Sequence, residues 1–504
     1  MSRAERPHLP GPTPRRALSR RTVLAGMLGA GVAALAGCDA IPSTSPVQGQ
    51  EFDRPLAIPP LAASRLRDGV RVFELTAQEG RTAFAPGIET PTWGFNAAHL
   101  GPTLRAARGE RVAVEVTNEL SETTSVHWHG MHLPARYDGG PHQPIEPGGT
   151  WRPTWRIDQP AATLWYHPHP HGATEEHVYR GLAGLFLLDD EYSRAASLPS
   201  EYGVDDVPVI VQDKKFDDAG RLDADSEGNE VGLFGDVVMT NGTVGAYHEV
   251  TTERIRLRLL NGSTARTYQF VLADRPFELV ATDGGLLDRP VRMDSLRLAP
   301  GERAEIVATM RPRERTVLRS EDPDLGGVAA PFAFGGNDSF DVLQLRAAEH
   351  LNPSPEPDWQ HEDTGLAEAE ATVTRTFELQ NREINGRRMD MNRIDETVTV
   401  GTTEIWEVTN IHPVSHSFHI HDVQFEVLSV DGQAPPPELS GRKDTVYLEP
   451  NRTYRLIMRF EDYADPDWPY MYHCHMLLHE DEGMMGQFVV VETGQRAGEV
   501  AHHH

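Results

Sequence analysis

The 504-residue sequence predicts an all-β protein built from three consecutive β-sandwich domains. Runs in which apolar and polar residues alternate with a period of two, as in strands with one buried face, recur at 70–75, 207–212, 303–309 and 488–491. Long helical periodicity is absent from the sequence. The 44 Gly and 38 Pro are typical of a turn-rich chain, which also favours a β architecture.

A strand-like segment that ends at an asparagine occurs three times, at Val112–Asn118, Ile255–Asn261 and Ile405–Asn410. The asparagines lie 143 and 149 positions apart, and a period of this length fits three copies of one sandwich domain. We therefore expect domains at 52–195, 196–350 and 371–495, with a linker at 351–370 and a tail at 496–504.

The amino terminus has the pattern of an export signal, predicted to cover residues 1–37 and to be followed by a linker at 38–51. Six arginines precede the apolar stretch Val23–Ala36, whose 14 residues are fewer than the roughly 20 that span a bilayer. Ser19–Leu24 resembles a twin-arginine signal, and Leu35–Cys38 resembles a lipobox. The alternative is an ordinary cleaved signal. The preferred prediction is an exported lipoprotein of the cell envelope, attached to the membrane only through a lipid on Cys38.

The net charge argues against one class of partner, and the cysteine content indicates a chemical role for one residue. The formal net charge of −28 argues against a nucleic-acid partner, because that affinity depends on Lys and Arg neutralising phosphates. Only Cys38 and Cys474 are present, so acylation of Cys38 leaves no disulfide partner for Cys474. We expect Cys474 to be kept for its chemistry.

Histidines are concentrated in pairs with one residue between them. A random chain with 23 His has about one such pair, whereas five occur here outside the terminal His502–His504. Four of them lie at His127/His129, His167/His169, His419/His421 and His473/His475. On a strand this spacing directs both side chains to one face. Eight imidazoles from four strands predict a shared metal cluster.

Copper is favoured over zinc for these ligands. A structural zinc site closes with four ligands, which does not use eight His. Cys474, His479, Met484 and His416 match the donors of a blue-copper site, namely two imidazoles, a thiolate and a weak axial thioether. Because strand side chains alternate, Cys474 faces one site while His473 and His475 face the other, across on the order of 12 Å.

The chain resembles the three-domain bacterial multicopper oxidases of the laccase and copper-efflux-oxidase type. The resemblance covers about residues 52–493 and is carried by four segments: His127–Gly130, Trp165–His169, His416–His421 and His473–Met484. It implies three cupredoxin-like Greek-key β-sandwich domains. It also implies four copper ions, with a reductant oxidised one electron at a time at a type 1 copper and dioxygen reduced to water at a trinuclear cluster.

The resemblance further implies ligand sets for each copper. The type 1 copper is expected to take His416, Cys474, His479 and Met484. The type 2 copper is expected to take His127 and His419. One type 3 copper is expected to take His129, His167 and His475, and the other His169, His421 and His473.

Two acids match residues that the family places near its cluster. Oxygen reduction consumes protons, so Asp138 and Glu480 are predicted to relay them. A plain surface role is the alternative for each. The copper ions already have their ligands, so a supporting or surface role is expected for the remaining histidines near the motifs. These are His132, His142, His171, His177 and His412.

The chain departs from the family pattern at two places. Ser417 stands where many relatives have Pro. The segment Gly441–Asp444 resembles one in which relatives often carry Trp, and it is expected to lie toward the substrate side.

The reductant is left open between two small molecules. Efflux-type relatives carry a methionine-rich insert suited to Cu(I), whereas the comparable stretch Asp322–Phe340 has no Met. This favours a laccase-like oxidase of phenols, with cuprous oxidation for copper tolerance as the alternative, since Met389 and Met391 remain. A non-catalytic cell-envelope protein on the same scaffold is the alternative from another class, because some relatives have lost their coppers. A copper nitrite reductase is disfavoured, since it does not need four such histidine pairs.

Overall fold

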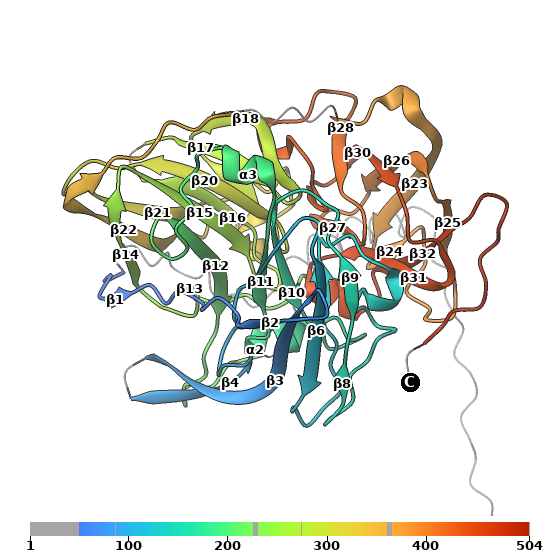
Figure 1. Cartoon of the computed structure of the whole chain (residues 1–504), viewed down its shortest axis with the longest axis horizontal. Coiled ribbons are helices and arrows are strands. Elements are labelled where there is room, and N and C mark those ends of the chain that lie inside the picture. The colour runs from blue at the N-terminus through green and yellow to red at the C-terminus, as the bar shows by residue number, and fades with distance from the viewer. Residues whose placement is uncertain (1–49, 86, 225–229, 274, 360–364, 503–504) are drawn as a thin grey trace, which may run out of the picture. The chain divides into compact units, whose positions relative to one another are not determined.

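The computed structural model describes residues 50–85, 87–224, 230–273, 275–359 and 365–502. Within these ranges strands predominate (Figure 1), and they form six sheets that fall into three pairs in chain order. The predicted all-β fold of three sandwiches is confirmed. Residues 1–37 and Cys38 lie outside the described ranges. Within those ranges, no helix has the length and apolar character needed to cross a bilayer.

The first sandwich combines two sheets. One contains β2 (Ser64–Arg67), β3 (Val70–Ala85), β4 (Ile88–Phe95), β6 (Arg111–Asn118), β8 (Thr150–Trp151) and β9 (Thr154–Arg156). The other has the order β5 (Leu104–Ala107), β11 (Gly184–Asp189), β10 (Thr163–His167) and β7 (His127–His129). Two short helices accompany this sheet: α2 (Thr174–Arg180) lies between β10 and β11 in the chain, and α3 (Glu191–Ala195) follows β11.

The second sandwich follows the same plan. One sheet has the order β13 (Val237–Thr240), β12 (Asp206–Lys214), β15 (Arg254–Asn261), β20 (Arg303–Thr309), β17 (Phe277–Thr282) and β18 (Gly285–Met293). The other has the order β1 (Arg54–Pro55), β14 (Ala246–Thr252), β22 (Phe340–Asn352), β21 (Arg315–Glu321), β16 (Tyr268–Leu272) and β19 (Leu296–Leu298). β1 pairs in parallel with β14, so the start of the described chain joins this sheet.

The third sandwich also has two sheets. One has the order β24 (Glu383–Ile384), β23 (Ala371–Gln380), β26 (Thr402–Asn410), β30 (Arg452–Phe460) and β28 (Phe425–Val430). The other has the order β25 (Glu396–Thr399), β32 (Met485–Val491), β31 (Asp465–Cys474), β27 (His416–Ile420) and β29 (Thr445–Leu448). Helix α4 (Leu477–Asp481) lies between β31 and β32 in the chain.

The repeated asparagine has the same structural role in each sandwich. Asn118, Asn261 and Asn410 end strands β6, β15 and β26, which pair in parallel with β3, β12 and β23. Each side chain is fully buried and accepts from the backbone N–H two residues later. Each also donates to one carbonyl of the turn that follows and to one carbonyl of a distant segment. A buried amide that satisfies a turn explains the repeat.

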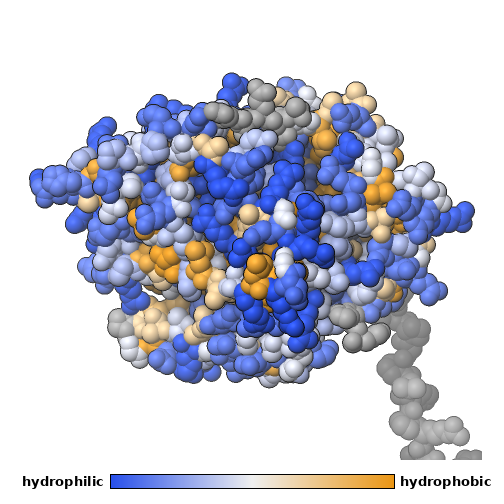
Figure 2. Space-filling model, viewed as in Figure 1, coloured by the Kyte–Doolittle hydropathy of each residue, from blue (hydrophilic) through white to orange (hydrophobic). Residues whose placement is uncertain are grey.

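Each sandwich has its own apolar core. Residues of the first gather around Trp128, those of the second around Ile306, and those of the third around Trp406. The face drawn in Figure 2 is largely hydrophilic, with its apolar residues in small separate patches. The histidine pairs lie on or directly after β7, β10, β27 and β31, which belong to the first and third sandwiches.

Candidate metal centre

Two antiparallel strand pairs position the histidine pairs. β7 pairs with β10 so that His127 lies opposite His167, and β27 pairs with β31 so that His419 lies opposite His473. In the second pair Phe418 lies opposite Cys474, so the thiol alternates with its histidine neighbours as strand geometry requires. All eight paired histidines are at most 1% exposed, so their ring nitrogens have no access to bulk water.

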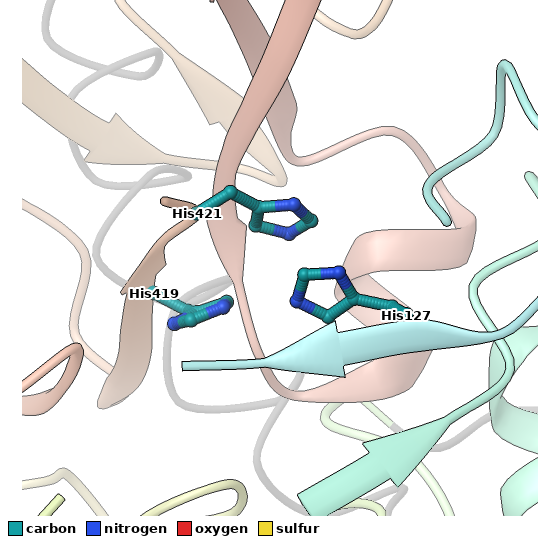
Figure 3. A group of neighbouring side chains, drawn as sticks. All are labelled: His127, His419 and His421. Atoms are coloured by element: carbon teal, nitrogen blue, oxygen red, sulfur yellow. The ribbon is translucent and has the colours of Figure 1, made fainter. Parts of the chain in front are cut away.

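The first and third sandwiches contribute to one cluster. The His127 ring stacks on that of His421 with centroids 3.8 Å apart, and the His129 ring stacks on that of His419 at 3.7 Å. Figure 3 shows His127 reaching from β7 toward His419 and His421 on the facing sandwich. Neither sandwich alone brings these rings together.

One expected type 3 set, His169, His421 and His473, presents its ring nitrogens to one point. In the other set His129 and His167 share such a point with His127 and not with His475. Nε2 of His473 lies 3.3 Å from Nε2 of His169 and 3.2 Å from Nε2 of His421. In the other set Nδ1 of His129 lies 3.4 Å from Nε2 of His167, and the His475 ring is centred 4.9 and 5.2 Å from those two rings. His127 and His419, expected at the type 2 copper, have ring centroids 5.7 Å apart.

In His127 and His419, the residues expected at the type 2 copper, hydrogen bonds leave one nitrogen of each ring free for a metal. His127 Nδ1–H donates to the Asp138 carbonyl and His419 Nδ1–H donates to the Asp444 carbonyl. Their Nε2 atoms are buried without a partner, as are both ring nitrogens of His475. Buried polar atoms are normally satisfied, so these atoms fit a bound cation that takes nitrogen ligands.

A second site surrounds Cys474. Its Sγ lies 3.4 Å from His416 Nδ1 and 3.5 Å from His479 Nδ1, and those two nitrogens are 3.2 Å apart. Met484 is fully buried in the same apolar core as Cys474, and its carbonyl accepts from the Cys474 N–H. Two imidazoles and a thiol fit blue copper, and Met484 is the residue that would supply the weak axial thioether.

Burial sets the protonation of both sites. It lowers the pKa of His416, His419 and His421 well below the usual value, and neighbouring histidines lower these pKa values further. Burial also raises the pKa of Cys474 to about 12. Neutral imidazoles are in the form that binds metal, whereas the thiol must exchange its proton for a cation.

Asp138 contacts two proposed ligands. Its Oδ2 accepts from His421 Nδ1–H at 2.6 Å, and its Oδ1 lies 3.4 Å from His127 Nδ1. The backbone after Asp138 packs closely against the segment before His127, because a Cβ on Gly139 would lie 1.7 Å from the Val126 carbonyl oxygen. Only glycine fits at this position. Asp138 is therefore held directly behind the cluster.

Glu480 contacts two other rings of the cluster. Its two carboxylate oxygens lie 3.1 Å from His169 Nδ1 and 3.2 Å from His473 Nδ1. Burial by itself raises the pKa of this carboxyl, but His169 and His473 outweigh burial and hold the pKa well below its usual range. The two predicted relay acids therefore both contact rings of the cluster.

The histidines left without a ligand role lie around these sites. His132 bridges Asp422 and Asp462, His142 contacts Gln487, and His177 contacts Thr124. The His412 ring stacks on that of His416, with centroids 5.5 Å apart.

Asp444 is a site residue that sequence reasoning missed. Together with its neighbours it was expected toward the substrate side, yet its Oδ1 accepts from His129 Nε2–H at 3.0 Å. Its backbone carbonyl also accepts from His419, so Asp444 belongs to the cluster. The sequence around it, Gly441–Thr445, contains no pattern that indicates this role.

Comparisons with known proteins agree with this geometry. Three family models described as multicopper oxidase match residues 76–193, 215–317 and 359–494. The chain is 37% identical to multicopper oxidase mco of Staphylococcus haemolyticus over 86% of this chain and 92% of that protein. It is 34% identical to cell division protein FtsP of Escherichia coli strain K12, over 94% of this chain and 99% of that protein.

Solved structures give the same result. The bacterial laccase-like multi-copper oxidase CueO from Ochrobactrum sp. superposes with a TM-score of 0.80 at 34% identity, over 87% of this chain and all (100%) of that one. This confirms that the three sandwiches are cupredoxin-like. By sequence and by fold, the chain belongs to the multicopper oxidase family.

Proposed function

We propose that this protein is a laccase-like oxidase that couples one-electron oxidation of phenols or similar reductants to the four-electron reduction of dioxygen to water. One observation carries the proposal. Cys474 faces His416 and His479 while its neighbours His473 and His475 face the histidine cluster. A single tripeptide therefore joins a candidate site for accepting electrons to a cluster in which several groups of histidines could each hold a metal ion.

The ligand assignments form part of this proposal. His416, Cys474, His479 and Met484 would hold the type 1 copper, and the eight paired histidines would hold a type 2 copper and two type 3 coppers. Copper bound at these positions supplies the one-electron chemistry and the binding of dioxygen. The chain itself excludes water from the ligands, fixes the ring tautomers and places carboxylates where protons are consumed.

The middle sandwich borders the side from which a reductant would reach Cys474. His479 Nε2–H donates to the carbonyl of Glu230, just before β13. Arg382 donates to the same carbonyl, and the half-buried His412 stacks on His416. A small reductant approaching the type 1 ligands therefore meets Glu230, His412 and Arg382 first.

Cuprous ion is a second candidate reductant, and one contact favours it. The Met389 N–H donates to the carbonyl of Gly483, in the turn between His479 and Met484. Met389 and Met391 are half-buried, so thioether sulfur lies on the segment that borders the type 1 ligands. Soft sulfur suits Cu(I), whereas the methionine-free stretch at 322–340 argues against a dedicated efflux oxidase.

Oxygen consumption on one copper-loaded sample tests these proposals. We expect uptake of dioxygen with a dimethoxyphenol, together with a blue absorption band at about 600 nm that bleaches on reduction. If only cuprous ion supports uptake, the laccase-like assignment is wrong and the second candidate replaces it. A copper-loaded protein with no blue band and no uptake would support the non-catalytic envelope role.

We also propose export through a twin-arginine signal and lipidation of Cys38. Replacing Cys38 with serine is expected to move the protein from the membrane fraction to the soluble fraction, because it removes the acylated thiol. The activity per molecule should not change, since Cys38 lies far along the chain from every proposed ligand. Fractionation and the mass of the mature amino terminus measure the outcome, and an unmodified Cys38 in the wild type would contradict it.

A further inference from the structure

Arg303, the first residue of β20, joins all three sandwiches. It is fully buried, and its guanidinium donates to Thr163 O of the first sandwich, to Gly301 O and Asp283 O of the second, and to Asp444 of the third. The contact with Asp444 is bidentate, with both N···O distances 2.6 Å. All the guanidinium donors are therefore used in one fixed orientation.

Asp444, which Arg303 holds, hydrogen-bonds to two proposed copper ligands on the side of each ring that faces away from the cluster. Asp444 Oδ1 accepts from His129 Nε2–H, and the Asp444 carbonyl accepts from His419 Nδ1–H. These bonds leave His129 Nδ1 and His419 Nε2 free to face the cluster. The two rings are stacked almost parallel, at 10°. Partners of this kind set the tautomer and orientation of a metal-binding histidine.

The same turn of the middle sandwich touches the cluster at a second place. A Cβ on Gly301 would lie 3.0 Å from the His475 ring, so the glycine lets the backbone approach that ring. Ser417 Oγ–H donates to Pro300 O at 2.8 Å. Ser417 lies between the proposed ligands His416 and His419, where many relatives have proline. The 300–303 segment thus contacts the cluster from the middle sandwich, which supplies no ligand.

Charge argues against a purely structural role. Arg303 and Lys443 are buried together with three carboxylates, those of Asp283, Glu302 and Asp444. Lys443 Nζ lies 2.9 Å from Asp283 and 3.1 Å from Glu302. An apolar layer usually joins domains at least as well as a buried ion network. Here three carboxylates share two cationic side chains and adjoin the proposed ligands of cations, which would offset the excess negative charge of the ionised carboxylates.

We propose that Arg303 is a positioning residue for the copper cluster, which holds Asp444 so that His129 and His419 present their free nitrogens. This inference rests on the proposed function, because it assumes that those histidines bind copper. It assigns to the middle sandwich direct control over metal binding between the other two.

Three variants of the copper-loaded protein test the inference. Arg303→Met is expected to weaken copper retention at the cluster about 10- to 100-fold, the usual effect of losing an outer partner of a ligand. The readouts are copper released to a competing chelator and the type 2 EPR signal, which should change while the blue band remains. Arg303→Lys should restore part of the effect, because lysine keeps the charge but not the bidentate contact. Asp444→Asn should alter the same EPR signal if Arg303→Met fails to fold.

Arg258→Met is the matched control. Arg258 is also a buried arginine between sandwiches, paired with Asp206 and Glu305 and in contact with the Thr163 hydroxyl, but it touches no proposed ligand. It should lower thermal stability without changing copper retention or EPR. Wild-type copper retention and EPR in Arg303→Met and Asp444→Asn would overturn this inference alone. Failure of the wild type to load copper at the cluster would overturn the proposed function and this inference with it.

Discussion

Replacing Cys474 with serine is expected to remove the blue band and to reduce reductant-supported oxygen uptake by more than about 100-fold. Losing a residue that only hydrogen-bonds to a metal ligand costs up to about 100-fold, and losing the ligand itself should cost more. The thiol is fully buried between His416 and His479, and a serine hydroxyl is a poor substitute for a thiolate toward copper. The same backbone also links the site to His473 and His475. One substitution therefore removes a ligand and disrupts electron entry.

The copper content of the Cys474→Ser protein distinguishes the loss of one copper ligand from misfolding of the whole protein. Cys474→Ser should lose one copper per chain and keep the type 2 EPR signal, because its side chain does not belong to the cluster. Met471→Leu, a buried substitution on the same strand β31, serves as control and should retain the blue band. A Cys474→Ser protein that stays blue, or still oxidises phenols at the wild-type rate, would contradict the assignment.

Replacing Glu480 with glutamine is expected to slow oxygen reduction about 100-fold or more, the scale of general acid catalysis. The change preserves shape but removes a carboxylate that lies 3.1 Å from His169 and 3.2 Å from His473. Helix α4, which carries Glu480, is joined to α2 through Asp481, whose carboxylate accepts from the N–H groups of Thr174 and Glu175. Glutamine cannot take up and release protons at that point.

The measurements on Glu480→Gln must follow the reduction of dioxygen separately from copper binding and from electron uptake. Glu480→Gln should bind the wild-type amount of copper and show an unchanged blue band, while reoxidation of the reduced protein by dioxygen slows. Glu482→Gln is the matched control, because this partly exposed carboxylate two residues later pairs with Arg382 and does not contact a proposed ligand. Wild-type reoxidation by Glu480→Gln would remove Glu480 from the mechanism.

Local patterns in the sequence predicted much of the fold and the grouping of histidines. The alternation of strand side chains predicted that Cys474 and its two neighbours face different sites, and the structure has this arrangement. The repeated asparagine predicted three domains, because each copy satisfies the same turn within five residues of itself. Short-range rules of this kind can be read from one chain.

The missed features depend on contacts between distant segments. Arg303 and Asp444 are separated by 141 positions, and neither lies in a pattern that indicates a metal site. The contact of His479 with Glu230 uses a backbone carbonyl, which every residue has. Alternation places a side chain on a face but does not identify what the facing domain presents to it. Such contacts become visible only when the three sandwiches are packed.

Copper analysis of the wild-type protein, combined with its absorption and EPR spectra, tests the central claim most directly. The account predicts four copper ions per chain, a blue band at about 600 nm from the Cys474 site and a separate type 2 EPR signal from the histidine cluster. A loaded protein with a single copper, or with copper but no blue band, would contradict it.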